Sequence, residues 1–131
     1  MRWREEIESR FGDRVTFDRV ERYLYSRDVG TVPSLVEKMM NNVPDAVAQP
    51  ESLEDLVFLA ELSRRHEVPL VPRGAGTSGY GGCVPARRGI VVDFTRLDRV
   101  LEVDPDGLQV RVEAGVVWKE LEKALADHGL A

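Results

Sequence analysis

The spacing of hydrophobic and polar residues changes along the chain and predicts helices and strands in a mixed order. In the first 30 residues, Val20, Tyr23 and Leu24 recur at helical spacing. We therefore expect short helices there that pack on a larger body. Residues 28–33 then break the pattern. Residues 34–40 are expected to form one further helical turn.

From residue 43 the pattern indicates strand, helix and strand. Residues 45–49 form a short apolar run that Pro50 stops. Ser52, with Asp55 three positions later, resembles a capping box at a helix start. The apolar positions expected to share the buried face of that helix are Leu53, Leu56, Val57 and Ala60. Residues 68–72 then read as a second strand, so we expect the two strands to pair in parallel through a right-handed crossover.

The remaining elements are predicted by shorter patterns. Residues 89–93 form a buried type of strand. Residues 100–103 and 108–113 are predicted to form a hairpin, because the sequence between them has the composition of a turn. An apolar repeat from Val117 to Leu125 predicts a final helix. Trp118 is expected to be one of the residues through which this helix packs.

Composition and charge narrow the classes of protein that fit this pattern. The chain has 131 residues, 43% hydrophobic and 31% charged, which is enough for one domain with its own core. Its net charge of -5 argues against a general nucleic-acid binder. No apolar run approaches the roughly 20 residues of a membrane span, and a cytoplasmic location is expected. Cys83 is the only cysteine, which excludes an intrachain disulfide and a cysteine-based metal site.

Residues 74–82 are the segment that carries chemistry, since five of these nine residues are glycine. Backbone N–H groups without neighbouring Cβ atoms can converge on a phosphate. Thr77 and Ser78 add hydroxyl donors, and Arg73 adds a positive charge. The alternative interpretation is an ordinary tight or flexible surface loop.

The same loop contains Gly74, Gly76 and Gly79 at the spacing of the dinucleotide-binding fingerprint, and Asp93 lies near its downstream acidic position. That fingerprint requires a helix to open at the loop. The later glycines and Pro85 leave no room for a helix before the next strand. A Walker loop also fails, because no Gly-Lys-Ser/Thr follows. A phosphate-binding loop between two strands remains.

Several segments together resemble the FAD-linked oxidase family, whose flavin domain is that of p-cresol methylhydroxylase and vanillyl-alcohol oxidase. They are residues 25–28, 68–78, 89–97 and 112–116. The chain looks most like the D-lactate dehydrogenase and glycolate oxidase flavin-subunit branch. The resemblance implies an α/β (α+β) fold, with a small parallel sheet flanked by helices as the first subdomain and the start of a second subdomain near Val100. Residues 1–42 would be an N-terminal helical segment, and residues 43–131 a flavin domain truncated at its C-terminus.

The resemblance also implies a cofactor, a reaction and a set of binding residues. The residues that would hold FAD are Arg73, Gly74, Ala75, Gly76, Thr77, Ser78, Gly79 and Gly82. Some relatives bond FAD through a histidine at the position of Thr77, so a threonine there implies non-covalent FAD. The protein would oxidise a small 2-hydroxy acid by hydride transfer to FAD. Electrons would pass to a separate iron–sulfur subunit or domain, which could also place the protein at a membrane surface.

The resemblance assigns no catalytic residue and no metal ligand to this chain, which by itself is expected to lack dehydrogenase activity. Three alternatives stay open at this point. The chain could be a non-catalytic nucleotide-binding module, part of another FAD-dependent alcohol or sugar oxidase of the same fold, or a Rossmann-type NAD domain.

Overall fold

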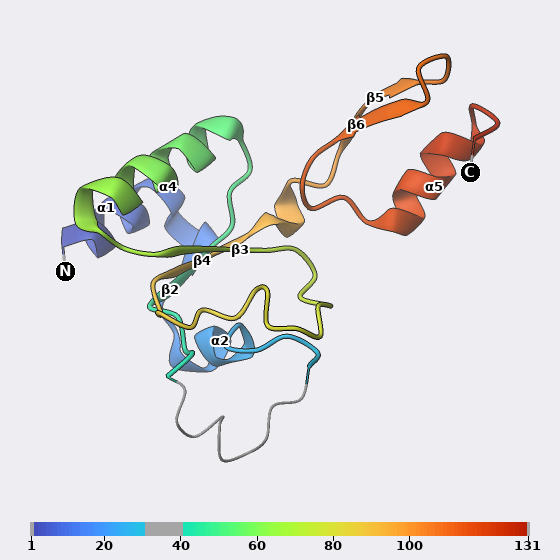
Figure 1. Ribbon diagram of the computed structural model, residues 1–131. Helices are drawn as coiled ribbons and strands as arrows, with labels where there is room; N and C mark the ends of the chain where they lie inside the picture. The colour runs from blue at the N-terminus through green and yellow to red at the C-terminus, as the bar shows by residue number, and fades with distance from the viewer. Residues whose placement is uncertain (1, 31–40, 131) are drawn as a thin grey trace.

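The central element of the fold is a four-stranded sheet with the order β1-β2-β4-β3. The computed structural model describes residues 2–30 and 41–130, so the helical turn expected at 34–40 lies outside the described residues. The strands are β1 (Val15–Thr16), β2 (Ala46–Ala48), β3 (Leu70–Arg73) and β4 (Ile90–Asp93). β2, β4 and β3 run parallel, and β1 joins β2 antiparallel (Figure 1).

The strand order corrects one expectation, because β2 and β3 do not pair directly. β4 lies between them, with Val91 opposite both Val47 and Val71. Every residue of β2 and β4 is buried, whereas β3 is only partly buried. A continuous apolar strand gains most at a central position, where both of its faces are covered. The crossover from β2 therefore passes over one strand before the chain re-enters the sheet.

Two helices lie together beside the sheet and complete the core (Figure 1). α1 (Arg2–Phe11) buries Trp3, Ile7 and Phe11, which recur every four residues on one helical face. α4 (Leu53–His66) begins where the capping box predicts, since the Ser52 hydroxyl accepts a hydrogen bond of 3.2 Å from the Asp55 N–H.

The buried face of α4 differs from the expected one. Leu53 and Val57 are 71% and 50% exposed. The buried positions are Asp55, Leu59 and Leu62. Asp55 turns inward because its carboxylate accepts hydrogen bonds from Arg10 at 3.0 Å and Arg14 at 2.6 Å. Apolar periodicity could not show this, because a charged residue belongs to the buried face.

The short helix α2 (Arg19–Leu24) confirms the helical spacing near residue 20, but its apolar residues are exposed. Asp18 caps the helix by accepting hydrogen bonds from the N–H groups of Val20 and Glu21, at 2.8 and 3.0 Å. The 3₁₀ turn η1 (Gly12–Arg14) and the two-residue strand β1, which no pattern predicted, connect α1 to α2.

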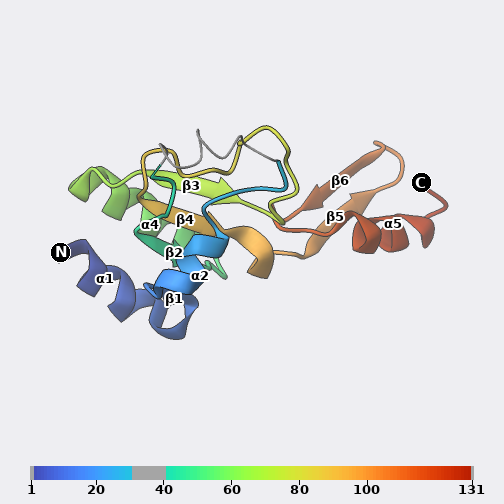
Figure 2. The same ribbon diagram turned by 90° about the horizontal axis from the view of Figure 1, so that it is seen from below.

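The predicted hairpin is confirmed as β5 (Val100–Asp104) paired antiparallel with β6 (Gln109–Val112). It follows the 3₁₀ turn η2 (Phe94–Arg96) and, with α5 (Trp118–Ala126), lies beyond one end of the sheet (Figures 1 and 2). The packing role expected for Trp118 is wrong. This side chain is 79% exposed, and Leu121 is the residue that α5 buries.

Candidate functional site

Polar side chains gather where the parallel strands end. Gln49 follows β2 directly, Arg73 is the last residue of β3, and Asp93 is the last residue of β4. Parallel strands bring their carboxyl ends to the same edge, and ligands of open α/β sheets bind outside that edge. The glycine-rich loop also leaves the sheet here, immediately after Arg73.

Asp93 is the centre of a hydrogen-bond network at this edge. Its side chain is buried, and its Oδ2 accepts hydrogen bonds from the Tyr25 hydroxyl at 2.7 Å and from Gln49 Nε2 at 3.0 Å. Its Oδ1 accepts a third from the Thr95 N–H at 2.9 Å. Burial raises the pKa of the Asp93 carboxyl, but these hydrogen bonds outweigh burial and leave the pKa below its ordinary value. Asp93 is therefore a carboxylate at neutral pH.

Tyr25 is the donor most affected by this carboxylate. Burial, followed by the hydrogen bond to Asp93, raises the pKa of the Tyr25 hydroxyl to about 12. The phenol consequently keeps its proton and acts as a hydrogen-bond donor. Its ring also lies under the Arg73 guanidinium, whose carbon is 5.1 Å from the ring centroid. The network thus extends from Gln49 through Asp93 and Tyr25 to Arg73.

The side chain of Arg73 packs against residues of the glycine loop. Its NH1 donates to the Arg27 carbonyl at 2.7 Å and lies 3.7 Å from the Cys83 Sγ. A Cβ added at Gly76 would stand 2.2 Å from Arg73 NH2, so the loop packs against its own arginine. Gly76 has a φ of +70°, which L side chains rarely adopt. These contacts make glycine necessary at residue 76.

The loop presents free backbone donors to solvent. The N–H groups of Thr77, Ser78 and Gly79 donate to no acceptor among the described residues. A Cβ added at Gly74 or Gly79 would meet nothing within 4 Å. No helix occurs among the described residues between β3 and β4, which agrees with the rejection of the Rossmann fingerprint. Backbone amides without an acceptor and with open space beside them can bind an anion such as a phosphate.

The sequence-predicted binding residues lie at the end of β3 and on the loop that follows it, and most of them are accessible. The exposed ones are Gly74, Ala75, Thr77, Ser78, Gly79 and Gly82. Gly76 is buried and Arg73 is half-buried. The roles of Tyr25 and Gln49 were missed, because their contacts with Asp93 span 68 and 44 residues of sequence. The sequence signal for these roles was position alone: Gln49 ends the predicted strand at 45–49, and Tyr25 lies in the segment 25–28 that resembles the family.

Cys83 closes the far end of the loop as a buried free thiol. Its sulfur lies near Arg73, and in the described residues no group of three or more His, Cys, Asp or Glu side chains could hold a metal ion. The described residues also include no helix with the length and apolar character needed to cross a membrane.

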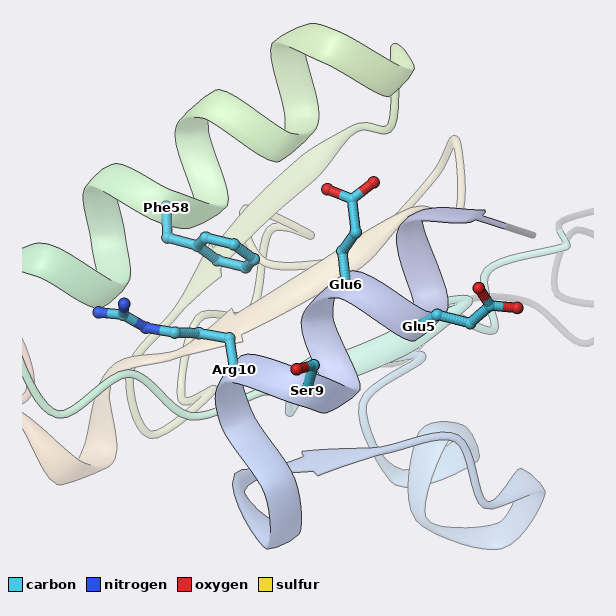
Figure 3. Close-up of a pocket in the computed structure, with 5 residues that line it drawn as sticks. All are labelled: Glu5, Glu6, Ser9, Arg10 and Phe58. Carbon is cyan, nitrogen blue, oxygen red and sulfur yellow. The ribbon is translucent and has the colours of Figure 1, made fainter.

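A hollow lies away from this edge, between α1 and α4. Its lining residues are Glu5, Glu6, Ser9, Arg10 and Phe58, shown in Figure 3. Arg10 is engaged with Asp55 and lies over the Phe58 ring at 5.6 Å. Glu6 pairs with His66 at 2.9 Å and Arg65 at 2.8 Å. We interpret this hollow as the seam between two packed helices, because its main charged groups are used within the protein.

Comparison with known proteins identifies the family and its cofactor. Residues 44–131, more than half of the chain, match the family described as FAD binding domain. The chain belongs to the FAD binding domain family. FAD is therefore the cofactor of this family, and the α/β fold of the p-cresol methylhydroxylase type is confirmed.

Relatives of this FAD binding domain include oxidases and dehydrogenases. It is 34% identical over 89 residues to glycolate oxidase subunit GlcD of Bacillus subtilis (strain 168), covering 68% of this chain and 19% of that protein. It is 30% identical over 118 residues to the mitochondrial D-lactate dehydrogenase [cytochrome] of Arabidopsis thaliana, covering 90% of this chain and 20% of that protein. The chain thus spans about a fifth of the length of these relatives.

Solved structures agree with the fold of this FAD binding domain. Alkyldihydroxyacetonephosphate synthase superposes with a TM-score of 0.82 at 26% identity, covering 98% of this chain and 27% of that one. p-Cresol methylhydroxylase gives the same TM-score of 0.82 at 18% identity, covering 98% of this chain and 25% of that one. The second likeness supports the architecture alone.

Proposed function

We propose that this chain binds FAD non-covalently through residues 73–82, and that it is the flavin-holding part of an oxidoreductase. The observation that supports the loop as the site is its set of free donors. The amides of Thr77, Ser78 and Gly79 have no acceptor within the described residues and lie on the loop that leaves the carboxyl edge of the sheet. A pyrophosphate supplies the oxygen acceptors that such amides lack.

The residues present fit a dinucleotide phosphate in three ways. Open space beside Gly74 and Gly79 leaves the backbone accessible to a bulky anion. The exposed hydroxyls of Thr77 and Ser78 can donate to phosphate oxygens. The Arg73 guanidinium, fixed beneath the loop, supplies positive charge in a chain whose net charge is -5. The open space extends to Gly82, where an added Cβ would come no closer than 3.8 Å to its nearest neighbour, the Ser78 Oγ.

Non-covalent attachment follows from the nucleophiles in the loop. The Thr77 hydroxyl is a poor nucleophile at neutral pH without an adjacent base. The Cys83 thiol is buried behind Arg73. Neither group offers an activated atom toward the accessible face of the loop. Acid precipitation of the FAD-loaded protein should therefore release the flavin into the supernatant.

For the reaction, we propose oxidation of a small 2-hydroxy acid. Glycolate and D-lactate, in the names of two relatives, share a carboxylate beside a carbon that bears a hydroxyl. FAD, when bound, supplies the acceptor for a hydride from that carbon. Electrons would then leave to a separate acceptor, for which an iron–sulfur protein is our proposal. The loop residues of this chain bind and orient the cofactor, and we assign them no proton transfer.

A second candidate is a different FAD-dependent enzyme of the same family. The chain is 33% identical over 96 residues to alkyldihydroxyacetonephosphate synthase of Trypanosoma brucei brucei, which covers 70% of this chain. Dye reduction by the protein purified from its natural source distinguishes the two. Reduction that depends on glycolate or D-lactate supports the first candidate, and none with any 2-hydroxy acid supports the second.

The binding site itself is tested by Gly76→Val. A β-branched residue at a φ of +70° is strained by about 1–3 kcal/mol, and its Cβ would collide with Arg73. We expect the dissociation constant for FAD, measured by calorimetry, to rise at least about tenfold.

Gly129→Val is the matched control, because Gly129 has the same φ of +70° but lies after α5, where a Cβ meets nothing within 4 Å. It should leave FAD affinity unchanged. Equal FAD affinity of the wild type and Gly76→Val would remove the loop from the cofactor site.

A further inference from the structure

The segment of residues 25–30 runs beside the glycine loop, although the two are about fifty residues apart in sequence (Figures 1 and 2). It precedes residue 44, where the match to the FAD binding domain family begins. Its contacts with the loop fall at both ends of the loop and come from side chains and backbone alike. We name residues 25–30 the support segment.

At the distal end of the loop, one carboxylate joins the two segments. Asp28 Oδ2 accepts a hydrogen bond of 2.7 Å from the Gly81 N–H. Its Oδ1 accepts another of 2.9 Å from the Gly30 N–H, which fixes the turn of the support segment. A carboxylate repels a phosphate, so Asp28 is suited to holding the loop and not to contacting the cofactor.

The two backbones also touch directly beside this hydrogen bond. A Cβ added at Gly30 would stand 2.5 Å from the Gly79 carbonyl oxygen. That distance is too short for any side chain, so glycine at residue 30 permits the close approach. The carbonyl of Gly79 therefore faces the support segment.

At the proximal end, the support segment holds the arginine. The Arg27 carbonyl accepts a hydrogen bond of 2.7 Å from Arg73 NH1, and the Tyr25 ring lies 5.1 Å from the guanidinium carbon. Gly76 packs on the same guanidinium. Fixing Arg73 thus also fixes the positive-φ turn of the loop.

We propose that the support segment positions the cofactor loop, and that Asp28 is a positioning residue for FAD binding. This inference rests on the proposed function of the loop. A segment rich in glycine loses much conformational freedom when it becomes ordered, and ordering before binding removes that cost from the binding step. The support segment holds the loop at Arg73, Gly79 and Gly81 and leaves the intervening donors of Thr77 and Ser78 free.

The test compares two aspartates with the same local chemistry. Asp28→Ala removes the hydrogen bond from the Gly81 N–H in the loop. Asp18→Ala removes two hydrogen bonds from backbone N–H groups at the start of α2, neither of which involves the loop. We expect Asp28→Ala to weaken FAD binding about tenfold and Asp18→Ala to leave it unchanged. Asp28→Asn should recover part of the affinity, because the amide oxygen can still accept one N–H.

Hydrogen exchange of the cofactor-free chain supplies a second readout. The amides of Tyr80 and Gly81, which donate hydrogen bonds to Ser78 Oγ and Asp28 Oδ2, should exchange faster in Asp28→Ala, while those of β4 should not change. Gly30→Ala, which keeps the carboxylate but pushes on Gly79, should have the same two effects.

The outcomes separate this inference from the proposed function. If Gly76→Val abolishes binding while Asp28→Ala and Gly30→Ala bind FAD like the wild type, the support segment has no positioning role and the loop remains the site. If the wild type does not bind FAD, or Gly76→Val binds it equally well, the proposed function fails and this inference fails with it. A loss in Asp18→Ala equal to that in Asp28→Ala would reduce the effect to general destabilisation of the N-terminal segment.

Discussion

At the scale of single residues, the site depends on groups that the loop sequence does not contain. The glycines and hydroxyls between residues 74 and 82 could be predicted as anion donors, because their chemistry is local. The position of Arg73 under the loop could not, since the Arg27 carbonyl and the Tyr25 ring that fix it come from a distant segment. The same holds for Asp93, whose hydrogen-bond donors Tyr25 and Gln49 are 68 and 44 residues away.

The Tyr25–Asp93 hydrogen bond predicts a specific alkaline titration. The folded-state pKa of Tyr25, about 12, lies above the ordinary value of 10.0. A raised pKa stabilises the fold fully below the ordinary pKa, and this contribution is lost as the pH rises from about 10 toward 12. Ultraviolet titration of tyrosinate should show a component near pH 12 that Tyr25→Phe removes. A component that disappears in Tyr25→Phe but titrates at or below pH 10 would contradict the buried hydrogen bond.

At the scale of elements, the patterns of apolar residues predicted the presence of helices and strands more accurately than the packing of those elements. The strands at 89–93 and the hairpin were predicted because their residues are continuous or alternate along the chain. The order β2-β4-β3 was not, because it depends on which strand is most completely covered. The rotation of α4 was also missed, since the inward residue Asp55 is held by two arginines from outside the helix.

Asp55 should therefore contribute more to stability than a surface ion pair. Its side chain is 6% exposed and that of Arg14 is 17% exposed. Asp55→Ala leaves Arg14 half-buried without this partner, and we expect a loss of about 2–4 kcal/mol in the free energy of unfolding by urea, followed by the fluorescence of buried Trp3. The control Glu102→Ala removes a pair whose side chains are 60% and 75% exposed, and should cost less than about 1 kcal/mol.

The pH dependence of this effect has a definite sign. Burial alone would raise the pKa of the Asp55 carboxyl. Hydrogen bonds from Arg14, the Glu51 N–H and Arg10 lower this pKa by more than burial raises it, so the net shift is downward. A lowered pKa gives stability that is present above the unfolded value, about 3.9, and is lost as the pH falls through the folded value. The difference between wild type and Asp55→Ala should shrink below about pH 4. A difference that grows on acidification would contradict the ion pairs.

At the scale of the whole molecule, the sheet with α1 and α4 forms one body, and the hairpin with α5 lies beyond its end (Figures 1 and 2). They meet at Gly115, whose N–H donates to the Leu97 carbonyl at 2.8 Å and where a Cβ would stand 1.9 Å from the Phe94 carbonyl oxygen. The resemblance predicted the fold and the cofactor, which the comparisons confirm, and the loop as the binding site, which stays a prediction. It did not show that residues 25–30 support the loop, because that arrangement exists only once the N-terminal segment has folded against the sheet edge.

The central claim, that the glycine loop binds FAD, is tested most directly by nuclear magnetic resonance of the ¹⁵N-labelled chain during titration with FAD. The account predicts saturable shifts of the Thr77, Ser78 and Gly79 amide signals, with the dissociation constant that calorimetry gives. Signals from the hollow between α1 and α4 should stay in place. Binding of FAD that leaves the three loop amides unmoved, or that shifts mainly residues of α1 and α4, would contradict it.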